Sequence, residues 1–214
     1  MARKQSWQYD YWLLLMQQYL LKPVGIKPVY NRDMVALSLE LHIPPAELHD
    51  RLRQLARLDT PRIERLWRDY GQNPKRLQRA VSLLRSMKGF NSGGDFYEGV
   101  EVEETFERDF RPLAEDGRLM PVALIVLLNL YFHLTPATMV SQTPEVQAMA
   151  KLLRIPVALV IEVLEIYQQC DPQLNRREVS FSPLLLPCQQ VWQRYGDDPL
   201  RLEAYADQLT AYYQ

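Results

Sequence analysis

The chain has 214 residues, of which 47% are hydrophobic and 24% are charged, and its formal net charge at pH 7 is −1. This composition excludes an intrinsically disordered protein and supplies enough apolar residues for one bilobed unit or two small packed domains. Two cysteines, Cys170 and Cys188, are too few for a disulfide framework and form no CxxC motif. We therefore expect two reduced thiols in a cytoplasmic protein.

Two apolar stretches raise the question of targeting or membrane insertion. The N-terminal stretch is interrupted by Gln17 and Gln18 and has no small-residue cleavage site, so we expect no signal peptide. The second stretch lies in the uncharged segment 119–144, but its strongly apolar part is only residues 122–132. That is about half of the ~20 residues that a membrane span needs. The sequence predicts a buried core helix there and no membrane association.

The first 90 residues predict five helices. Asn31 is a suitable N-cap for the second helix, because its side-chain oxygen can accept from a free amide of the first turn. Thr60-Pro61 and Asn73-Pro74 are typical starts of the fourth and fifth helices, and Gly71 ends the fourth. The predicted ranges are Tyr9–Leu21, Arg32–Leu41, Pro45–Arg57, Pro61–Tyr70 and Pro74–Met87.

The segment 91–119 differs in kind from what precedes it. It begins with the flexible sequence NSGGD and continues as the acidic, aromatic sequence FYEGVEVEETFERDF. Residues 100–103 alternate between valine and glutamate, which fits a short strand, although glutamates also favour helix, and both alternatives stay open. The aromatic residues are candidate docking anchors for this linker: Phe96, Tyr97, Phe106 and Phe110.

The last 95 residues predict five more helices, with Asp198-Pro199 as the start of the last. The insertion 173–185 contains RREVSFS, whose alternation fits a strand or a wing-like loop. The predicted helices are Pro121–Leu134, Pro144–Leu153, Pro156–Gln169, Pro187–Tyr195 and Pro199–Tyr212. The predicted fold class is therefore all-α, with one small hairpin possible in the linker or the insertion.

A repeat relates the two sets of helices. The segment WRDYGQNPKRL (residues 67–77) reappears 125 positions later as WQRYGDDPLRL (residues 192–202). Upstream the spacing is 112, which pairs Tyr19 with Tyr131, Ala36 with Ala148, Ile43-Pro44 with Ile155-Pro156, and Asp59 with Asp171. The difference between the spacings places an insertion between Pro172 and Trp192. We predict an internal duplication into two homologous bundles, residues 1–90 and 120–214, joined by the linker 91–119.

Segment 32–58 arranges small and apolar residues around a turn: Val35, Ala36, Leu41, Ile43, Leu48 and Leu52. This arrangement resembles a helix-turn-helix, most like the core of a winged-helix domain. A small residue such as Ala36 would let the two helices cross closely. Segment 144–170 matches through Val146, Ala148, Leu153, Ile155, Val160 and Leu164. The resemblance implies that the second helix reads DNA in the major groove. The turn carries His42 or Arg154 where many such turns carry glycine.

The second helix of the motif differs between the halves. In the first half its predicted solvent positions are mixed in charge, and they include Glu47, Arg51 and Gln54. The matched residues of the second half are Leu159, Val163 and Ile166, a second apolar stripe on a helix that already has one. A helix with two apolar faces is covered on two faces. We predict that this stripe is an interface with the other repeat or a second subunit, rather than an exposed ligand groove.

Charge is unevenly distributed along the chain. Residues 1–90 contain 16 Lys or Arg and 8 Asp or Glu, whereas residues 91–119 contain 3 and 9. One interpretation is a nucleic-acid surface on the first repeat. The other is that the acidic linker folds back over the basic face and neutralises it. A hybrid of the two is a nucleic-acid site that the linker masks until the linker is displaced. The candidate nucleic-acid contacts are Arg51, Arg53, Arg57, Arg65, Arg68, Lys75, Arg76 and Arg79.

Motifs for catalysis, metal binding and cofactors are missing from the sequence. Its three histidines, His42, His49 and His133, form no HxxxH or HExxH motif, and there is no glycine-rich phosphate loop or GxSxG elbow. We expect no cofactor, no metal and no identifiable small-molecule substrate. The leading hypothesis is a non-enzymatic protein-interaction or scaffolding protein that binds a protein partner or forms a homodimer. The alternative is a nucleic-acid-binding or transcription-regulatory protein that uses its basic first repeat.

Overall fold

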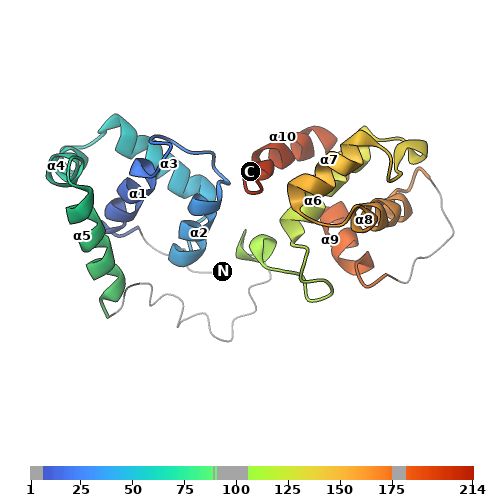
Figure 1. The fold of residues 1–214 in the computed structure, drawn as a ribbon, viewed down its shortest axis with the longest axis horizontal. Helices are drawn as coiled ribbons and strands as arrows, with labels where there is room; N and C mark the ends of the chain where they lie inside the picture. Colours follow the sequence, from blue (N-terminus) through green and yellow to red (C-terminus); the bar gives the residue numbers. More distant parts are fainter. Residues whose placement is uncertain (1–6, 89, 91–105, 175–181) are drawn as a thin grey trace. The chain divides into compact units, whose positions relative to one another are not determined.

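The structure is a computed structural model that describes residues 7–88, 90, 106–174 and 182–214. In these residues the chain forms ten α-helices, two short 3-10 helices and no strand, which confirms the all-α fold predicted from the sequence (Figure 1). The segments that could hold a hairpin, 91–105 and 175–181, lie outside the described residues. The contacts divide the chain into unit 1, Met1–Val102, and unit 2, Glu103–Gln214.

Unit 1 consists of five helices. They are α1 (Tyr11–Leu20), α2 (Arg32–Leu41), α3 (Pro45–Arg57), α4 (Pro61–Tyr70) and α5 (Pro74–Ser86). Each agrees with the predicted range to within two residues at either end. The predicted caps form: the side chain of Asn31 accepts a hydrogen bond from the amide of Asp33 (3.0 Å), and that of Thr60 accepts one from Ile63 (3.3 Å). These bonds satisfy amides that a helix start leaves without partners.

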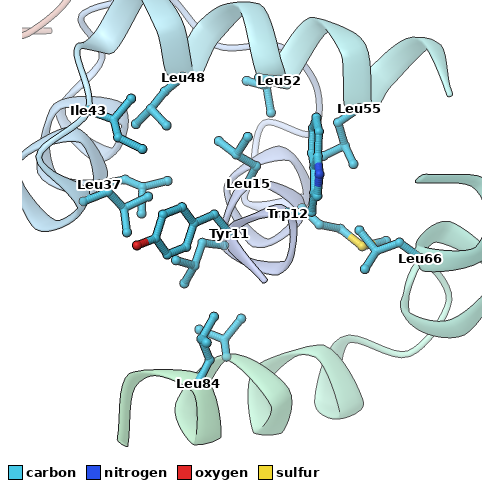
Figure 2. Close-up of a cluster of buried hydrophobic side chains, with 14 of the residues drawn as sticks. Tyr11, Trp12, Leu15, Leu37, Ile43, Leu48, Leu52, Leu55, Leu66 and Leu84 are labelled. Atoms are coloured by element: carbon cyan, nitrogen blue, oxygen red, sulfur yellow. The ribbon is translucent and has the colours of Figure 1, made fainter. Parts of the chain in front are cut away.

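The core of unit 1 surrounds α1, which packs against α2, α3 and α5. Tyr11 and Leu15 of α1 lie between the apolar stripe of α3 and Leu84 of α5 (Figure 2). The stripe of α3 is Leu48, Leu52 and Leu55, and all three side chains are fully buried. The predicted helical spacing of leucines in α3 therefore produces one buried face and leaves its polar face to solvent.

The turn between α2 and α3 is closed by a residue in the left-handed region. His42 has φ 54° and ψ 34°, and Arg154, 112 residues later, has φ 58° and ψ 40°. Glycine adopts this conformation with the least strain. The same backbone conformation therefore recurs at the repeat spacing even though neither residue is glycine.

The small residue at the close approach of the two helices is not the one predicted. Ala36 and its counterpart Ala148 are exposed, whereas Ser38 and its counterpart Ala150 are buried. The carbonyl of Ser38 accepts from the amide of Ile43 at 3.1 Å, and that of Ala150 accepts from Ile155 at 3.0 Å. Ser38 and Ala150 thus lie inside the turn, two positions beyond the residues that the sequence pattern indicated.

Unit 2 contains η1 (Phe106–Phe110), α6 (Pro121–His133), η2 (Pro136–Thr138), α7 (Pro144–Leu153), α8 (Val157–Cys170), α9 (Leu185–Tyr195) and α10 (Pro199–Thr210). Helix α6 is its centre, because it packs against η1, α7, α8, α9 and α10. Its residues Val122–Leu128 are all buried, as predicted for a core helix. No helix in the described ranges of the chain has both the length and the apolar character needed to cross a membrane.

The packing of the two units differs in the helix that follows the helix-turn-helix-like pair. In unit 2, α9 packs against both α6 and α8, whereas the main helix contact of α4 in unit 1 is with α5. Three residues separate α3 from α4, but fourteen residues separate α8 from α9. The matched tryptophan has matched neighbours in both units. Trp67 donates from Nε1 to the carbonyl of Leu55, and its ring centroid lies 5.4 Å from that of Tyr19. The ring centroid of Trp192 lies 6.3 Å from that of Tyr167 and 5.8 Å from that of Tyr131. The contacts of this tryptophan therefore recur, while α9 packs more extensively against its neighbours than α4 does.

Candidate functional site

The predicted interface stripe lies in the core of unit 2. The side chains of Leu159, Val163 and Ile166 are 4%, 0% and 1% exposed. Their helix, α8, packs against α6, α7 and α9, all in the same unit. The expectation that two apolar faces need two covers fits this packing, because three helices of the same unit pack around α8. The stripe therefore needs neither the other repeat nor a second subunit, and it offers no surface to a partner.

The linker anchors fall into two groups. Phe106 and Phe110 belong to η1 of unit 2, where Phe110 is buried and its ring centroid lies 5.4 Å from that of Tyr212. Phe96 and Tyr97 lie outside the described residues. The part of the linker that follows residue 105 is therefore built into unit 2.

The acidic residues of this same part of the linker have cationic partners in unit 2. The carboxylate of Asp109 is buried and accepts two hydrogen bonds from the guanidinium of Arg194, at 2.7 and 2.8 Å. This bidentate pair raises the pKa of Arg194 above its usual value. Asp116 pairs with Arg118, and Glu107 lies 3.6 Å from Arg111. These three carboxylates therefore pair with arginines of unit 2 and not with the basic residues of the first repeat.

The candidate basic residues of α3 are arranged along its solvent face. Arg53 and Arg57 are exposed, and the only ion-pair neighbour of Arg53 in the described residues is Asp50 at 4.0 Å, the limit of such a contact. Arg51 is half-buried, and its guanidinium lies 5.1 Å from the ring centroid of Trp7. Arg51 therefore packs on the ring of Trp7 as well, and its role as a nucleic-acid contact stays a prediction.

The basic residues of α4 and α5 lie on the solvent side of both helices, because the core side is formed by Ile63, Leu66, Leu77, Val81 and Leu84. Arg76 lies over the ring of Tyr70 at 5.1 Å. Arg65, Arg68, Lys75 and Arg79 are exposed, and no ion pair joins them to another described residue. We call the exposed residues Arg53, Arg57, Arg65, Arg68, Lys75, Arg76 and Arg79 the basic surface of unit 1.

This surface suits a ligand with several separated negative charges. Helices α4 and α5 carry seven basic and two acidic residues, and only Arg85 of the seven forms a close ion pair, with Glu40 at 2.6 Å, among the described residues. Exposed arginines and lysines without carboxylate partners can each neutralise a phosphate and release a counterion.

Two apolar side chains beside the basic surface are not apparent from the helical pattern. Leu83 and Met87 of the α5 region are 63% and 54% exposed, although they are four residues apart and so share a side of the helix. Helix α5 buries Leu77, Val81 and Leu84, so neither Leu83 nor Met87 belongs to its core face. An apolar pair on a basic helix is a feature of protein- as well as nucleic-acid-binding surfaces.

One histidine of unit 1 is buried and sensitive to pH. Burial lowers the pKa of His49, and the charge of nearby Arg53 lowers it further, against smaller opposing effects of a hydrogen bond to the backbone of Lys27 and of Asp50. A histidine with a folded pKa below its unfolded value of about 6.5 contributes stability above that pH. This contribution is lost as the pH falls through the folded pKa.

We therefore expect His49→Gln to reduce the loss of stability between pH 7 and pH 5. Urea unfolding at a series of pH values measures this slope directly. His133→Gln is the comparison, because it removes an exposed histidine at the end of α6 in place of a buried one. An unchanged slope in His49→Gln would show that His49 does not titrate differently in the folded protein.

The thiols and acidic groups offer little nucleophilic or metal chemistry. Cys170 and Cys188 are free, and burial raises the pKa of Cys170 to about 11 and that of Cys188 further. Thiols with such pKa values are protonated near neutral pH and are poor nucleophiles. Within the described ranges, no three His, Cys, Asp or Glu side chains are placed to hold a metal ion together.

Hollows lie on the surface of unit 2, and two of them are bordered entirely by described residues. One, of about 500 Å³, is bordered by the Asp109–Arg194 pair and by Arg108, whose guanidinium donates to the side chain of Gln190 at 2.8 Å. Its charges are therefore largely satisfied by one another. The other, of about 490 Å³, is bordered by Phe132 and Trp192 and by the carboxylates of Asp171 and Asp197.

No known protein family, curated protein or solved structure matches the chain. The function of this protein has to be argued from its own surfaces.

Proposed function

We propose that the protein binds nucleic acid through the basic surface of unit 1. The observation that supports this proposal is the set of exposed arginines and lysines on α3, α4 and α5 that have no close acidic partner among the described residues. The predicted protein-interaction stripe on α8 is buried in the core of unit 2, so it does not support a protein partner. The excess of basic charge in the first half supports the alternative, nucleic-acid binding.

The proposed contacts are mainly with the phosphate backbone. The exposed residues of α3 are Ala46, Asp50, Arg53 and Arg57. The first half of this solvent face therefore carries no basic residue, and both arginines lie in its second half. A helix that reads bases usually presents hydrogen-bonding side chains from its N-terminal part to the major groove. Here the cationic groups lie at the C-terminal part of α3 and on α4 and α5. We therefore propose binding with little sequence preference.

The experiment is a fluorescence-anisotropy titration of a labelled DNA duplex with the full chain at several salt concentrations. Binding should weaken as salt rises, because each phosphate contact releases counterions. Arg65→Gln/Arg79→Gln should weaken binding to all sequences and reduce the slope of log K against log salt by about two, one for each lost phosphate contact. Both side chains are exposed, so the variant should fold as the parent does.

The matched control is Lys151→Gln/Arg201→Gln, which removes two exposed positive charges from α7 and α10 of unit 2. It changes the net charge by the same amount and should leave the slope unchanged. Equal effects of the two variants would mean that only net charge matters, which contradicts a site on unit 1. Binding that does not depend on salt would contradict a phosphate-contacting surface.

A protein-interaction function is the second candidate, and Leu83 and Met87 are the observation that favours it. Exposed apolar side chains that lie together are more common at protein interfaces than elsewhere on a surface. The DNA titration separates the two candidates. If the chain shows no affinity for DNA at low salt, the exposed apolar pair Leu83 and Met87 is the better-supported binding feature.

A further inference from the structure

The second hollow of unit 2, which we call the α6–α9 hollow, combines aromatic walls with carboxylates. Phe132 at the end of α6 and Trp192 of α9 border it, with ring centroids 5.6 Å apart and ring planes inclined at 34°. Asp171 and Asp197 border it as well, and Asp197 is exposed, so the hollow opens to solvent. Its volume of about 490 Å³ lies within the range of small-ligand sites.

The aromatic wall is held in place by its own contacts. The ring of Trp192 packs against Tyr131 and Tyr167, with centroid separations of 5.8 and 6.3 Å. Gly196 lies directly beneath the same ring, since a Cβ atom there would come within 2.9 Å of Nε1. The indole therefore has little freedom to leave the hollow or to close it.

Among the described residues, the carboxylate of Asp171 is oriented by neutral donors. Asp171 accepts hydrogen bonds from the hydroxyl of Tyr131 at 2.7 Å and from the amide of Gln173 at 2.8 Å, which fix its orientation but are neutral donors. No ion pair joins Asp171 or Asp197 to a cationic side chain within the described ranges. A positive ligand group would thus meet an oriented carboxylate and a second, solvent-exposed one.

The matched positions of unit 1 lack this combination. At the repeat spacings of 112 and 125, Phe132 corresponds to Leu20 and Asp197 to Gln72, although Asp171 and Trp192 have the same residue types as Asp59 and Trp67. The connection before α9 is also longer than that before α4. The aromatic ring of Phe132 and the carboxylate of Asp197 are therefore features of the second half alone.

We propose that the α6–α9 hollow binds an organic cation, an alkylammonium or guanidinium group. Aromatic rings attract such cations through their negative faces, and desolvation by the ring walls strengthens this attraction. Carboxylates add charge attraction and hydrogen-bond acceptors. A metal ion fits less well, because the aromatic rings of Phe132 and Trp192 cannot coordinate it. The α6–α9 hollow shares no residue with the basic surface of unit 1, so this proposal does not depend on the nucleic-acid proposal.

The test follows the indole N–H signal of Trp192 by NMR in the full chain, which contains four tryptophans. The probes are n-butylammonium chloride and methylguanidinium chloride, with n-butanol as the neutral analogue and sodium chloride at equal ionic strength. Both cations should shift this signal saturably, whereas butanol and sodium should not. Short peptides containing lysine or arginine form a second arm: tighter binding than the free cations indicates a peptide side chain as the natural ligand, and equal binding indicates a small amine.

Two substitutions replace wall residues with little risk to the fold. Phe132→Leu introduces the residue found at the matched position of unit 1, and Asp197→Asn removes an exposed charge. Each should weaken binding about threefold or more, the scale of one cation–aromatic or charge contact at a partly exposed site. Asp207→Asn is the matched control, because it removes one exposed carboxylate from α10 outside the hollow. It should leave the affinity unchanged.

Three results would overturn the proposal. The first is no saturable shift of the Trp192 signal with either cation. The second is equal binding of butanol, which would make the hollow an apolar surface only. The third is an equal loss of affinity in Asp207→Asn and Asp197→Asn, which would reduce the effect to the net charge of the chain.

Discussion

Val163→Asp should lower the free energy of unfolding by about 4 kcal/mol or more, because it places an unpaired charge in an apolar core. The Val163 side chain has no exposed surface, and its helix is covered by α6, α7 and α9. Urea denaturation followed by circular dichroism measures the loss, and light scattering gives the mass of the soluble protein. We expect a destabilised or unfolded chain.

The control for this substitution is Ala158→Asp, in the first turn of the same helix. Ala158 is exposed, and a negative charge near a helix N-terminus interacts favourably with the helix dipole, so stability should stay unchanged or rise slightly. A folded Val163→Asp protein of half the parent's mass would instead show that the stripe is a subunit interface. A folded variant with unchanged mass would show that the site is exposed.

Gly71→Ala and Gly196→Ala should each destabilise the protein by about 1–3 kcal/mol, the usual cost of overpacking. A Cβ atom at Gly71 would lie 2.6 Å from the carbonyl oxygen of Trp67 and 2.8 Å from its ring. At Gly196 the corresponding distances to Trp192 are 2.8 and 2.9 Å. In both cases the glycine follows a helix and lets the tryptophan ring of the preceding turn lie against the backbone.

Gly117→Ala is the matched control, because nothing lies within 4 Å of a Cβ atom at that position. Its stability should equal or slightly exceed that of the parent, since alanine restricts the unfolded chain. Thermal unfolding of the three variants compares them under one condition. If Gly71→Ala and Gly196→Ala unfold like Gly117→Ala, the tryptophan–glycine contact does not explain the repeated spacing.

Helix positions follow from the sequence because their signals are local. Thr60-Pro61, Asn73-Pro74 and Asp198-Pro199 each mark a helix start, and the helices begin at Pro61, Pro74 and Pro199. A capping side chain and a proline act within one turn, so no distant contact is needed to interpret them. The apolar content of residues 122–132 likewise predicts the buried helix α6.

The small residue at the helix crossing shows where a local pattern is insufficient. Ala36 and Ala148 have the expected size, but Ser38 and Ala150 are the buried pair. The direction in which α2 and α7 face their partners depends on packing against α3 and α8, which spacing alone does not specify. A shift of two residues along a helix changes the face completely.

Of the two candidate sites, the sequence indicates the basic surface of unit 1 but not the α6–α9 hollow. Charge composition predicts a basic surface on the first half, and its arginines are exposed because a charged side chain without a partner is costly to bury. Arg51 is the exception, since the ring of Trp7, remote in sequence, lies beside it. No sequence signal indicates the α6–α9 hollow, whose walls come from residues 132, 171, 192 and 197.

The sequence by itself determined the all-α fold, the helix boundaries and the excess of basic charge in the first half, because caps, helical spacing and charge act over a few residues. The tertiary structure alone decided what covers the apolar stripe of α8 and where aromatic and acidic side chains meet. Both outcomes depend on how α6, α7 and α9 pack around α8. The apolar pattern indicates that a helix face is buried, but it does not indicate which helix covers that face.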